Sequence, residues 1–202
     1  MSQTTASRRA TVLFFIAYTI LLVGLVLLDQ TTKFHAQKMF LAWSHPTDVQ
    51  MFQSSSHNVL TLGTAPGSGN WFELNFTYVR NTGAIWGMLN NLPRGLSNAF
   101  FLGLYPIFMI ILGLTFRASK SGQRLLRFSI ICILSGAVGN FIDRATLGYV
   151  IDWMHPMWRI FGWTYSYPVF NIADAAIVCG VSFWFIDGLL ETHITKQMTT
   201  KP

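Results

Sequence analysis

Two long stretches without a single charged residue constrain this 202-residue chain more than any other feature. Residues 10–28 (ATVLFFIAYTILLVGLVLL) and 95–116 (GLSNAFFLGLYPIFMIILGLTF) are long enough, as helices, to cross the roughly 30 Å hydrocarbon core of a bilayer. Only 11% of the residues are charged, whereas a soluble domain carries about 25%. The sequence therefore predicts an integral membrane protein and excludes an ordinary soluble enzyme and a disordered chain.

Two shorter apolar segments follow, and both have carboxylates at their ends. Residues 128–142 are uncharged and are followed by Asp143. Residues 168–190 contain two charged residues, Asp174 and Asp187. The predicted fold is a membrane α-helical protein with four transmembrane helices in a single domain, 1–202. The expected spans are about 10–28, 95–116, 126–143 and 170–190, with outer segments at 29–94 and 144–169.

The first span is predicted to be an uncleaved anchor. Arg8 and Arg9 precede it, as in a signal peptide, but Asp29, Gln30 and Lys33 stand where a small-residue cleavage site would be.

The distribution of Lys and Arg sets the expected orientation. The segment 117–127 (RASKSGQRLLR) holds four basic residues and no acid, and with four spans it lies on the same side as both termini. We therefore expect both termini in the cytoplasm and both outer segments outside. The net charge of +6 is better explained by anionic lipid than by nucleic acid, because the basic residues are spread along an apolar chain.

The outer segment after the first span has two parts. Residues 44–70 are rich in Ser, Gly and Asn and are typical of a mobile loop. Residues 71–89 alternate Phe72, Leu74, Phe76 and Tyr78, which predicts a small extracytoplasmic β-sheet lying on the membrane surface, with a turn at 81–83. The aromatic residues of 153–167 are most simply an interfacial belt, and a lid over a lipid-binding groove is the alternative.

The outer ends of the spans collect the polar residues that are costly to keep at a membrane boundary. Asp29 and Lys33 are an i, i+4 pair, and so are Asn140 and Arg144. The set as a whole is Asp29, Lys33, Asn140, Asp143, Arg144, Asp152, Asn171 and Asp174.

Two carboxylates in such an apolar site suit acid–base chemistry on an amide. When they lie close together they share one proton, so one can activate water while the other polarises a peptide carbonyl, without a metal or another cofactor. The competing catalytic motifs are missing: there is no H-E-x-x-H, no G-x-S-x-G and no nucleotide-binding glycine loop. Lys33 could serve a Ser–Lys pair, but its spacing from Asp29 favours an ion pair.

Each of these residues also has a structural explanation. Asp174 could simply cap a helix, Asp143 could pair with its neighbour Arg144, and Cys132 and Cys179 are expected to be small apolar residues. Two other functions are possible. A proton or cation relay would need ionisable groups at several depths, and a non-catalytic scaffold would leave the clustered polar groups without a purpose.

Five motifs, in this order, resemble the lipoprotein signal peptidases, the bacterial signal peptidase II family. They are DQTTK (29–33), NTGAIWG (81–87), SGAVGNFIDR (135–144), YVIDW (149–153) and FNIADAAI (170–177). The resemblance implies a four-span inner-membrane aspartyl endopeptidase with its site on the periplasmic side. It implies cleavage of diacylglyceryl-modified prolipoproteins before the lipidated cysteine and inhibition by globomycin.

Carried over onto this sequence, the family's catalytic pair falls on Asp152 and Asp174. The other motif residues are implied to bind substrate or order the site: Asp29, Lys33, Asn81, Gly83, Asn140, Asp143, Arg144 and Asn171. Asp152 lies between Ile151 and Trp153 with no basic neighbour, which favours proton sharing with Asp174 over a structural role.

The chain departs from the family pattern in three places. The segments 44–70 and 152–174 are longer than is usual, and Ser135 stands where glycine is common. None of these touches the motif polar residues. A complete site in one chain gives no reason to require a dimer, so a monomer in contact with membrane lipids is expected.

Overall fold

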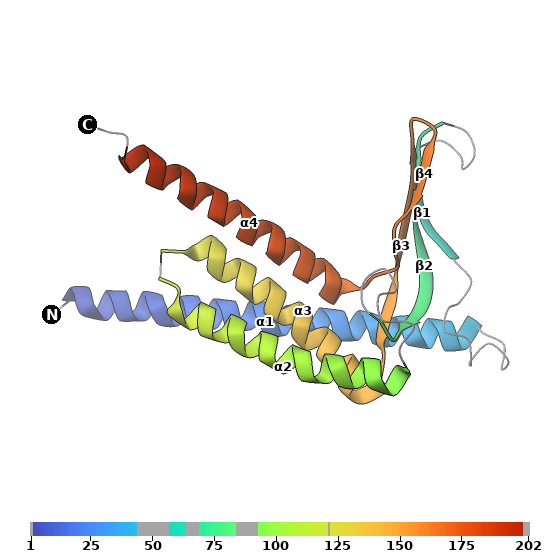
Figure 1. Cartoon of the computed structure of the whole chain (residues 1–202), viewed down its shortest axis with the longest axis horizontal. Helices are drawn as coiled ribbons and strands as arrows, with labels where there is room; N and C mark the ends of the chain where they lie inside the picture. Colours follow the sequence, from blue (N-terminus) through green and yellow to red (C-terminus); the bar gives the residue numbers. More distant parts are fainter. Residues whose placement is uncertain (1, 44–56, 64–68, 84–92, 121, 200–202) are drawn as a thin grey trace. The chain divides into compact units, whose positions relative to one another are not determined.

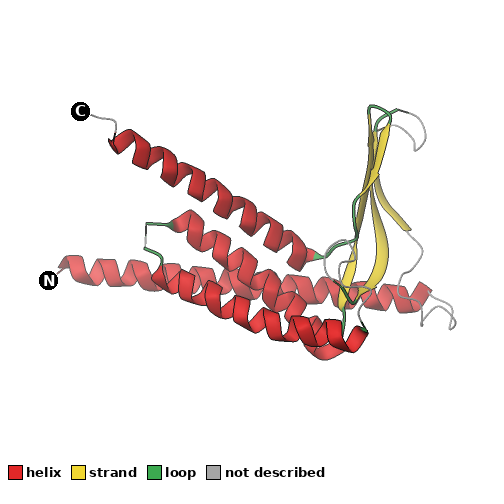
Figure 2. Cartoon of the chain, viewed as in Figure 1, coloured by secondary structure: helices red, strands yellow, loops and turns green. Residues whose placement is uncertain are grey.

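The computed structural model describes residues 2–43, 57–63, 69–83, 93–120 and 122–199 of the chain. The elements follow one another in the order α1, β1, β2, α2, α3, β3, β4, α4 (Figure 1). Among the described residues, four helices are long and apolar enough to cross a membrane, and four strands form one sheet (Figure 2). The predicted fold class is confirmed.

The helices are α1 (Ser2–Trp43), α2 (Arg94–Ala118), α3 (Arg124–Leu147) and α4 (Ile172–Thr199). The chain forms two compact units, each described here by itself. The first unit consists of Met1–Leu28, Leu104–Gly139 and Ala173–Pro202 and contains most of the helical residues.

Glycines allow α3 and α4 to approach closely within the first unit. A Cβ atom on Gly136 would collide with the carbonyl oxygen of Ala173, and one on Gly180 would lie 2.7 Å from the carbonyl oxygen of Ser129. Small residues at such contacts are the usual means by which membrane helices pack. Beside this contact, Leu112 of α2 packs against buried Ile130 of α3.

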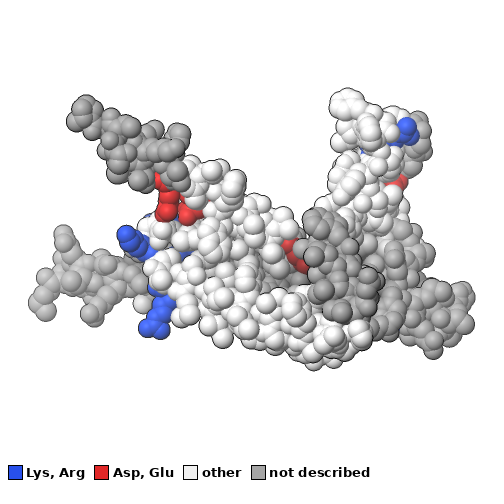
Figure 3. Space-filling model, viewed as in Figure 1, with Lys and Arg blue, Asp and Glu red and all other residues white. Residues whose placement is uncertain are grey.

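The outward faces of α1 and α2 are apolar and exposed. Leu13 is 67% exposed and Ile107 is 58% exposed, as expected of side chains that face lipid. Basic side chains are visible at the end of α2 and α3 that carries their connection (Figure 3).

The second unit consists of Asp29–Gly103 and Asn140–Ile172 and holds the sheet. The strands pair antiparallel in chain order. They are β1 (His57–Gly63), β2 (Trp71–Asn81), β3 (Val150–Ile160) and β4 (Trp163–Ser166).

Two backbone positions with positive φ shape the connections around β3. Gly148 (φ 80°) ends α3, and its N–H donates to the carbonyl oxygen of Arg144, as in a left-handed helix cap. Phe161 (φ 50°) turns β3 into β4, and its N–H donates to Asn70 Oδ1 at 2.9 Å.

The last turns of α1 form a core with the sheet. Phe40 stacks on Tyr78 with ring centroids 4.3 Å apart, and both side chains are buried together with Ala36, Phe76 and Ile151. This contact holds the end of α1 against β2 and β3, the strands that supply the polar site described below.

The first helix extends beyond the predicted span 10–28 to Trp43, and it includes Asp29 and Lys33, which neutralise each other inside the protein. One sequence expectation was wrong here. The segment 44–70 is not wholly a loop, because residues 57–63 form β1, which pairs with β2. The rest of that loop, 44–56 and 64–68, and the end of the predicted strand region, 84–89, lie outside the described residues.

Candidate active site

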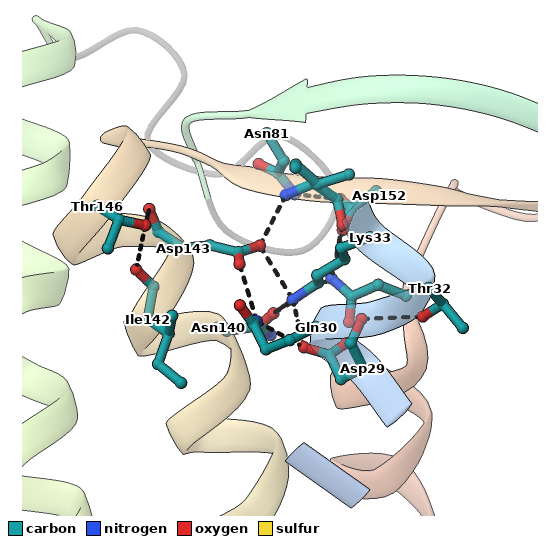
Figure 4. A network of polar contacts seen from close by, with 12 residues as sticks. Asp29, Gln30, Thr32, Lys33, Asn81, Asn140, Ile142, Asp143, Thr146 and Asp152 are labelled. Carbon is teal, nitrogen blue, oxygen red and sulfur yellow. Dashed lines mark hydrogen bonds and ion pairs between the residues drawn. The ribbon is translucent and has the colours of Figure 1, made fainter. Parts of the chain in front are cut away.

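A buried ion cluster joins α1 to α3 in the second unit (Figure 4). Lys33 Nζ lies 2.8 Å from Asp29 Oδ2 and 3.0 Å from Asp143 Oδ2, and it donates a hydrogen bond of 2.9 Å to Asn140 Oδ1. All three charged side chains are nearly inaccessible to solvent. An ammonium group has three protons to donate, and each has an acceptor here. The predicted ion pair between Asp29 and Lys33 is confirmed.

Asp143 is also held by two neutral donors. Gln30 Nε2 donates to Asp143 Oδ1 at 3.0 Å and to Asp29 Oδ2 at 3.1 Å, and the backbone N–H of Ile151 donates to Asp143 Oδ2 at 3.0 Å. Asp143 therefore ties α1, α3 and the start of β3 together. Gln30 was not predicted as a site residue from the sequence, although it lies inside the DQTTK motif beside Asp29.

Asp152 on β3 is 2% exposed, and a carboxamide holds each of its carboxylate oxygens. Asn81 Nδ2 donates to Oδ2 at 2.9 Å, and Asn171 Nδ2 donates to Oδ1 at 2.7 Å. Asn81 reaches this position because it ends β2, which is paired with the first residues of β3. Its own Oδ1 accepts the N–H of Gly83 at 3.0 Å. The residues that would follow the turn predicted at 81–83 lie outside the described part of the chain.

Asn171 and Asn140 connect Asp152 to the ion cluster. Asn171 is fully buried, and its Nδ2 lies 3.2 Å from Asn140 Oδ1, the same oxygen that accepts from Lys33. It also donates to the carbonyl oxygen of Ile151 at 3.2 Å. A continuous polar network thus runs from Lys33 through Asn140 and Asn171 to Asp152.

Arg144 does not pair with Asp143. Its Nη2 donates to the carbonyl oxygen of Gly83 at 2.6 Å, and its guanidinium lies over the Phe101 ring at 4.0 Å from the centroid. The pairing suggested by adjacency in the sequence is wrong because neighbouring residues of a helix point in different directions. Arg144 instead fixes the segment that follows β2.

Asp174 belongs to the first unit and stands in the first turn of α4, where it is half-buried. A carboxylate is favoured in this position by the partial positive charge of the helix N-terminus. The structure therefore brings together, within the second unit, all the predicted site residues except Asp174, which follows Asn171 by three residues. The described residues include no group of three or more His, Cys, Asp and Glu side chains arranged to hold a metal ion.

Comparisons with known proteins point to one family. The family model described as signal peptidase (SPase) II matches residues 20–190. A lipoprotein signal peptidase of Bacillus pumilus is 34% identical over 186 residues, which are 91% of this chain and 99% of that relative. A lipoprotein signal peptidase of Geobacter metallireducens is 40% identical over 111 residues, 55% of this chain and 65% of that relative.

Solved structures of bacterial membrane enzymes are similar over most of the chain. One has a TM-score of 0.66 and 31% identity and covers 89% of this chain and 91% of its own. Another has a TM-score of 0.58 and 29% identity, with coverage of 86% and 92%.

Proposed function

The chain belongs to the signal peptidase II family, aspartic endopeptidases that remove signal peptides from prolipoproteins, and we propose that Asp152 and Asp174 are its catalytic pair. The observation that carries this assignment is the setting of Asp152. It is buried, and its two oxygens accept hydrogen bonds from neutral carboxamide donors at 2.9 and 2.7 Å. Such a carboxylate can exchange a proton with a second carboxylate.

The chain itself limits the separation of Asp152 from Asp174. Asn171 touches Asp152, and three residues span at most about 11 Å even when fully extended. The length of the chain between Asn171 and Asp174 therefore permits these two residues to form a catalytic pair.

In the proposed reaction, one carboxylate removes a proton from water while the other, protonated, donates to the carbonyl oxygen of the scissile peptide. The water oxygen forms a bond to the carbonyl carbon. The C–N bond then breaks as the carboxyl group that had activated the water returns that proton to the leaving amine. The other carboxylate takes back a proton from the gem-diol, which leaves a new carboxyl terminus and restores the pair.

The remaining site residues are proposed to position this pair. The Asp29–Lys33–Asp143 cluster fixes the start of β3 through the N–H of Ile151, the residue before Asp152. Arg144 fixes the residues after Asn81 through its hydrogen bond to the carbonyl oxygen of Gly83.

We propose that the substrate is a diacylglyceryl-modified prolipoprotein, cleaved before its lipidated cysteine. The described polar site lies at the ends of apolar helices, and acyl chains can anchor a peptide there at about 0.8 kcal/mol per buried methylene. Globomycin-type inhibitors would compete for this site. A single chain supplies every proposed site residue, so we propose that one domain, 1–202, acts as a monomer.

The proposed location is the bacterial inner membrane, with both termini in the cytoplasm and the site and sheet on the periplasmic side. The support is the basic connection between α2 and α3, which includes Arg117, Lys120, Arg124 and Arg127. A topology reporter fused after Lys201 should be cytoplasmic, and one inserted at residue 55 should be exported. The reverse pattern would refute this orientation.

The catalytic assignment is tested by a gel-shift assay of a lipidated precursor at matched levels of folded protein. Asp152→Asn and Asp174→Asn should each lower turnover by about 10²-fold or more. Asp187→Asn, in α4 but outside the polar network, is the matched control and should stay active. If Asp152→Asn cleaves normally while folded Asp143→Asn is inactive, the pair is Asp143 with Asp174.

The lipid requirement is tested with the same precursor lacking the diacylglyceryl group. It should be cleaved far more slowly than the lipidated form, and equal rates would exclude the proposed anchoring.

A further inference from the structure

A pocket of about 370 Å³ lies in the second unit, away from the Asp152 network. It is lined by the end of β2, the start of α2 and the residues that follow α3. The residues that carry the argument are Arg80, Asn98 and Tyr149. A volume of this size is typical of small-ligand sites.

Arg80 is held by aromatic side chains, not by a described carboxylate. Its guanidinium is surrounded by aromatic rings, 5.5 Å from the centroid of Tyr149, 5.7 Å from Phe40 and 5.9 Å from Tyr78. No carboxylate among the described residues forms an ion pair with it. Burial raises the pKa of Tyr78, so this phenol stays neutral at pH 7 and supplies no negative charge.

Two buried polar atoms of the pocket residues lack hydrogen-bond partners within the described part of the chain. They are the donor Nε of Arg80 and the acceptor Oδ1 of Asn98. The Asn98 amide nitrogen is already used, because it donates to the carbonyl oxygen of Arg144 at 3.3 Å. An unsatisfied donor on a cation and an unsatisfied acceptor in one pocket call for a ligand that has both an anionic acceptor and a hydroxyl donor.

The depth of the pocket in the membrane narrows the choice of ligand. Gly95 is the first residue of one apolar span and Leu147 the last residue of another, and both line the pocket. The ends of spans lie at the level of the lipid headgroups. Phosphate is the anion found there, and arginine binds phosphate through two donors in parallel.

We propose that this pocket binds the phosphoglycerol headgroup of an anionic lipid, with the phosphate on Arg80 and a glycerol hydroxyl on Asn98 Oδ1. This is an accessory site, separate from the residues proposed to cleave the substrate. It would make the retention of phosphatidylglycerol depend on two side chains that the proteolytic reaction does not use.

The proposal is tested by native mass spectrometry of the detergent-solubilised full chain mixed with equal amounts of two dioleoyl lipids. Phosphatidylglycerol should be retained about tenfold better than phosphatidylcholine, which has no hydroxyl and no net charge. Phosphatidylethanol, anionic but without a headgroup hydroxyl, should lie between the two. Equal retention of all three lipids would overturn the proposal.

Variants then locate the site. Arg80→Gln should lose the preference for phosphatidylglycerol over phosphatidylcholine, and Asn98→Leu should lose only its preference over phosphatidylethanol. Arg159→Gln removes the same charge from the same sheet outside the pocket and should leave both preferences unchanged. A wild-type preference that survives in folded Arg80→Gln would overturn the assignment.

A soluble ligand distinguishes the source of the phosphoglycerol group. Glycerol 3-phosphate should compete with the lipid only at much higher concentration, because it lacks the acyl chains. Competition at equal concentration would assign the pocket to a soluble phosphate compound and overturn the lipid proposal.

Discussion

Lys33 Nζ lies 3.0 Å from Asp143 Oδ2, although the cation next to Asp143 in the chain is Arg144. The ammonium comes from α1 and the carboxylate from α3, so this contact joins two residues that are more than 100 positions apart in sequence. Arg144 is left to bind the carbonyl oxygen of Gly83. The two basic residues thus have separate tasks: one holds a carboxylate in place, and the other holds the backbone after β2.

Lys33→Met should strongly destabilise the protein. It leaves the carboxylates of Asp29 and Asp143 buried without a cation, and breaking a buried pair in this way costs about 3–5 kcal/mol. The thermal unfolding temperature in detergent measures the effect. Lys38→Met, an exposed lysine on the same helix, is the control and should change little. Adding Asp143→Asn to Lys33→Met should recover part of the loss, and no recovery would contradict the charge explanation.

Asn171→Ala should lower turnover more than Asn81→Ala does. Each substitution removes one donor from Asp152, an effect of about 1–3 kcal/mol, but Asn171 also contacts Asn140 and the carbonyl oxygen of Ile151. The rate of precursor cleavage at saturating substrate tests this order. Asn58→Ala, an exposed amide on β1, should cleave normally. If the two substitutions lower turnover equally, the connection of Asn171 to the ion cluster does not contribute to turnover.

Gly136→Ala should destabilise the contact of α3 with α4 by about 1–3 kcal/mol, because the new methyl group collides with the backbone of Ala173. Since Ala173 precedes Asp174, activity should fall as well. Gly113→Ala, where a Cβ meets no atom within 4 Å, is the matched control and should be neutral or slightly stabilising. Unfolding temperature and cleavage rate together test the pair of variants. An unchanged Gly136→Ala protein would show that the two helices separate easily.

His155 on β3 should make the pairing of β3 with β4 sensitive to mild acid. Its ring is hydrogen-bonded to Thr77 at 3.0 Å and to Ser166 at 2.8 Å, and burial lowers the pKa of His155 below its usual 6.5. The unfolded chain therefore binds a proton before the folded one does, and the stability of the sheet decreases as pH falls below about 6.5. Hydrogen exchange of the β3 and β4 amides from pH 7.5 to 5.5 measures this. In His155→Gln, the exchange rates of these amides should depend less on pH. If their pH dependence is the same as in the wild type, the role of His155 is refuted.

The sequence determined the features that depend on local spacing and on hydrophobicity. The four spans follow from apolar length, which the bilayer requires wherever the helices pack. The pairing of Asp29 with Lys33 follows from their i, i+4 spacing on one helix. A strand within 71–89 follows from the alternation of Phe72, Leu74, Phe76 and Tyr78, and the structure has it at Trp71–Asn81. The ordered motifs identified the family.

Only the tertiary structure decided which distant groups meet. Residues 57–63 (HNVLTLG) lie in a segment otherwise rich in Ser, Gly and Asn, and they become a strand because they pair with the edge of β2. The first helix passes through two charged residues because a third, Asp143, arrives from α3 to complete their cluster. Gln30 and the N–H of Ile151 join the same carboxylate from separate elements. These contacts form between segments that are far apart in the chain. The free energy of burying each charge depends on its partners, and those partners are not adjacent to it in the sequence.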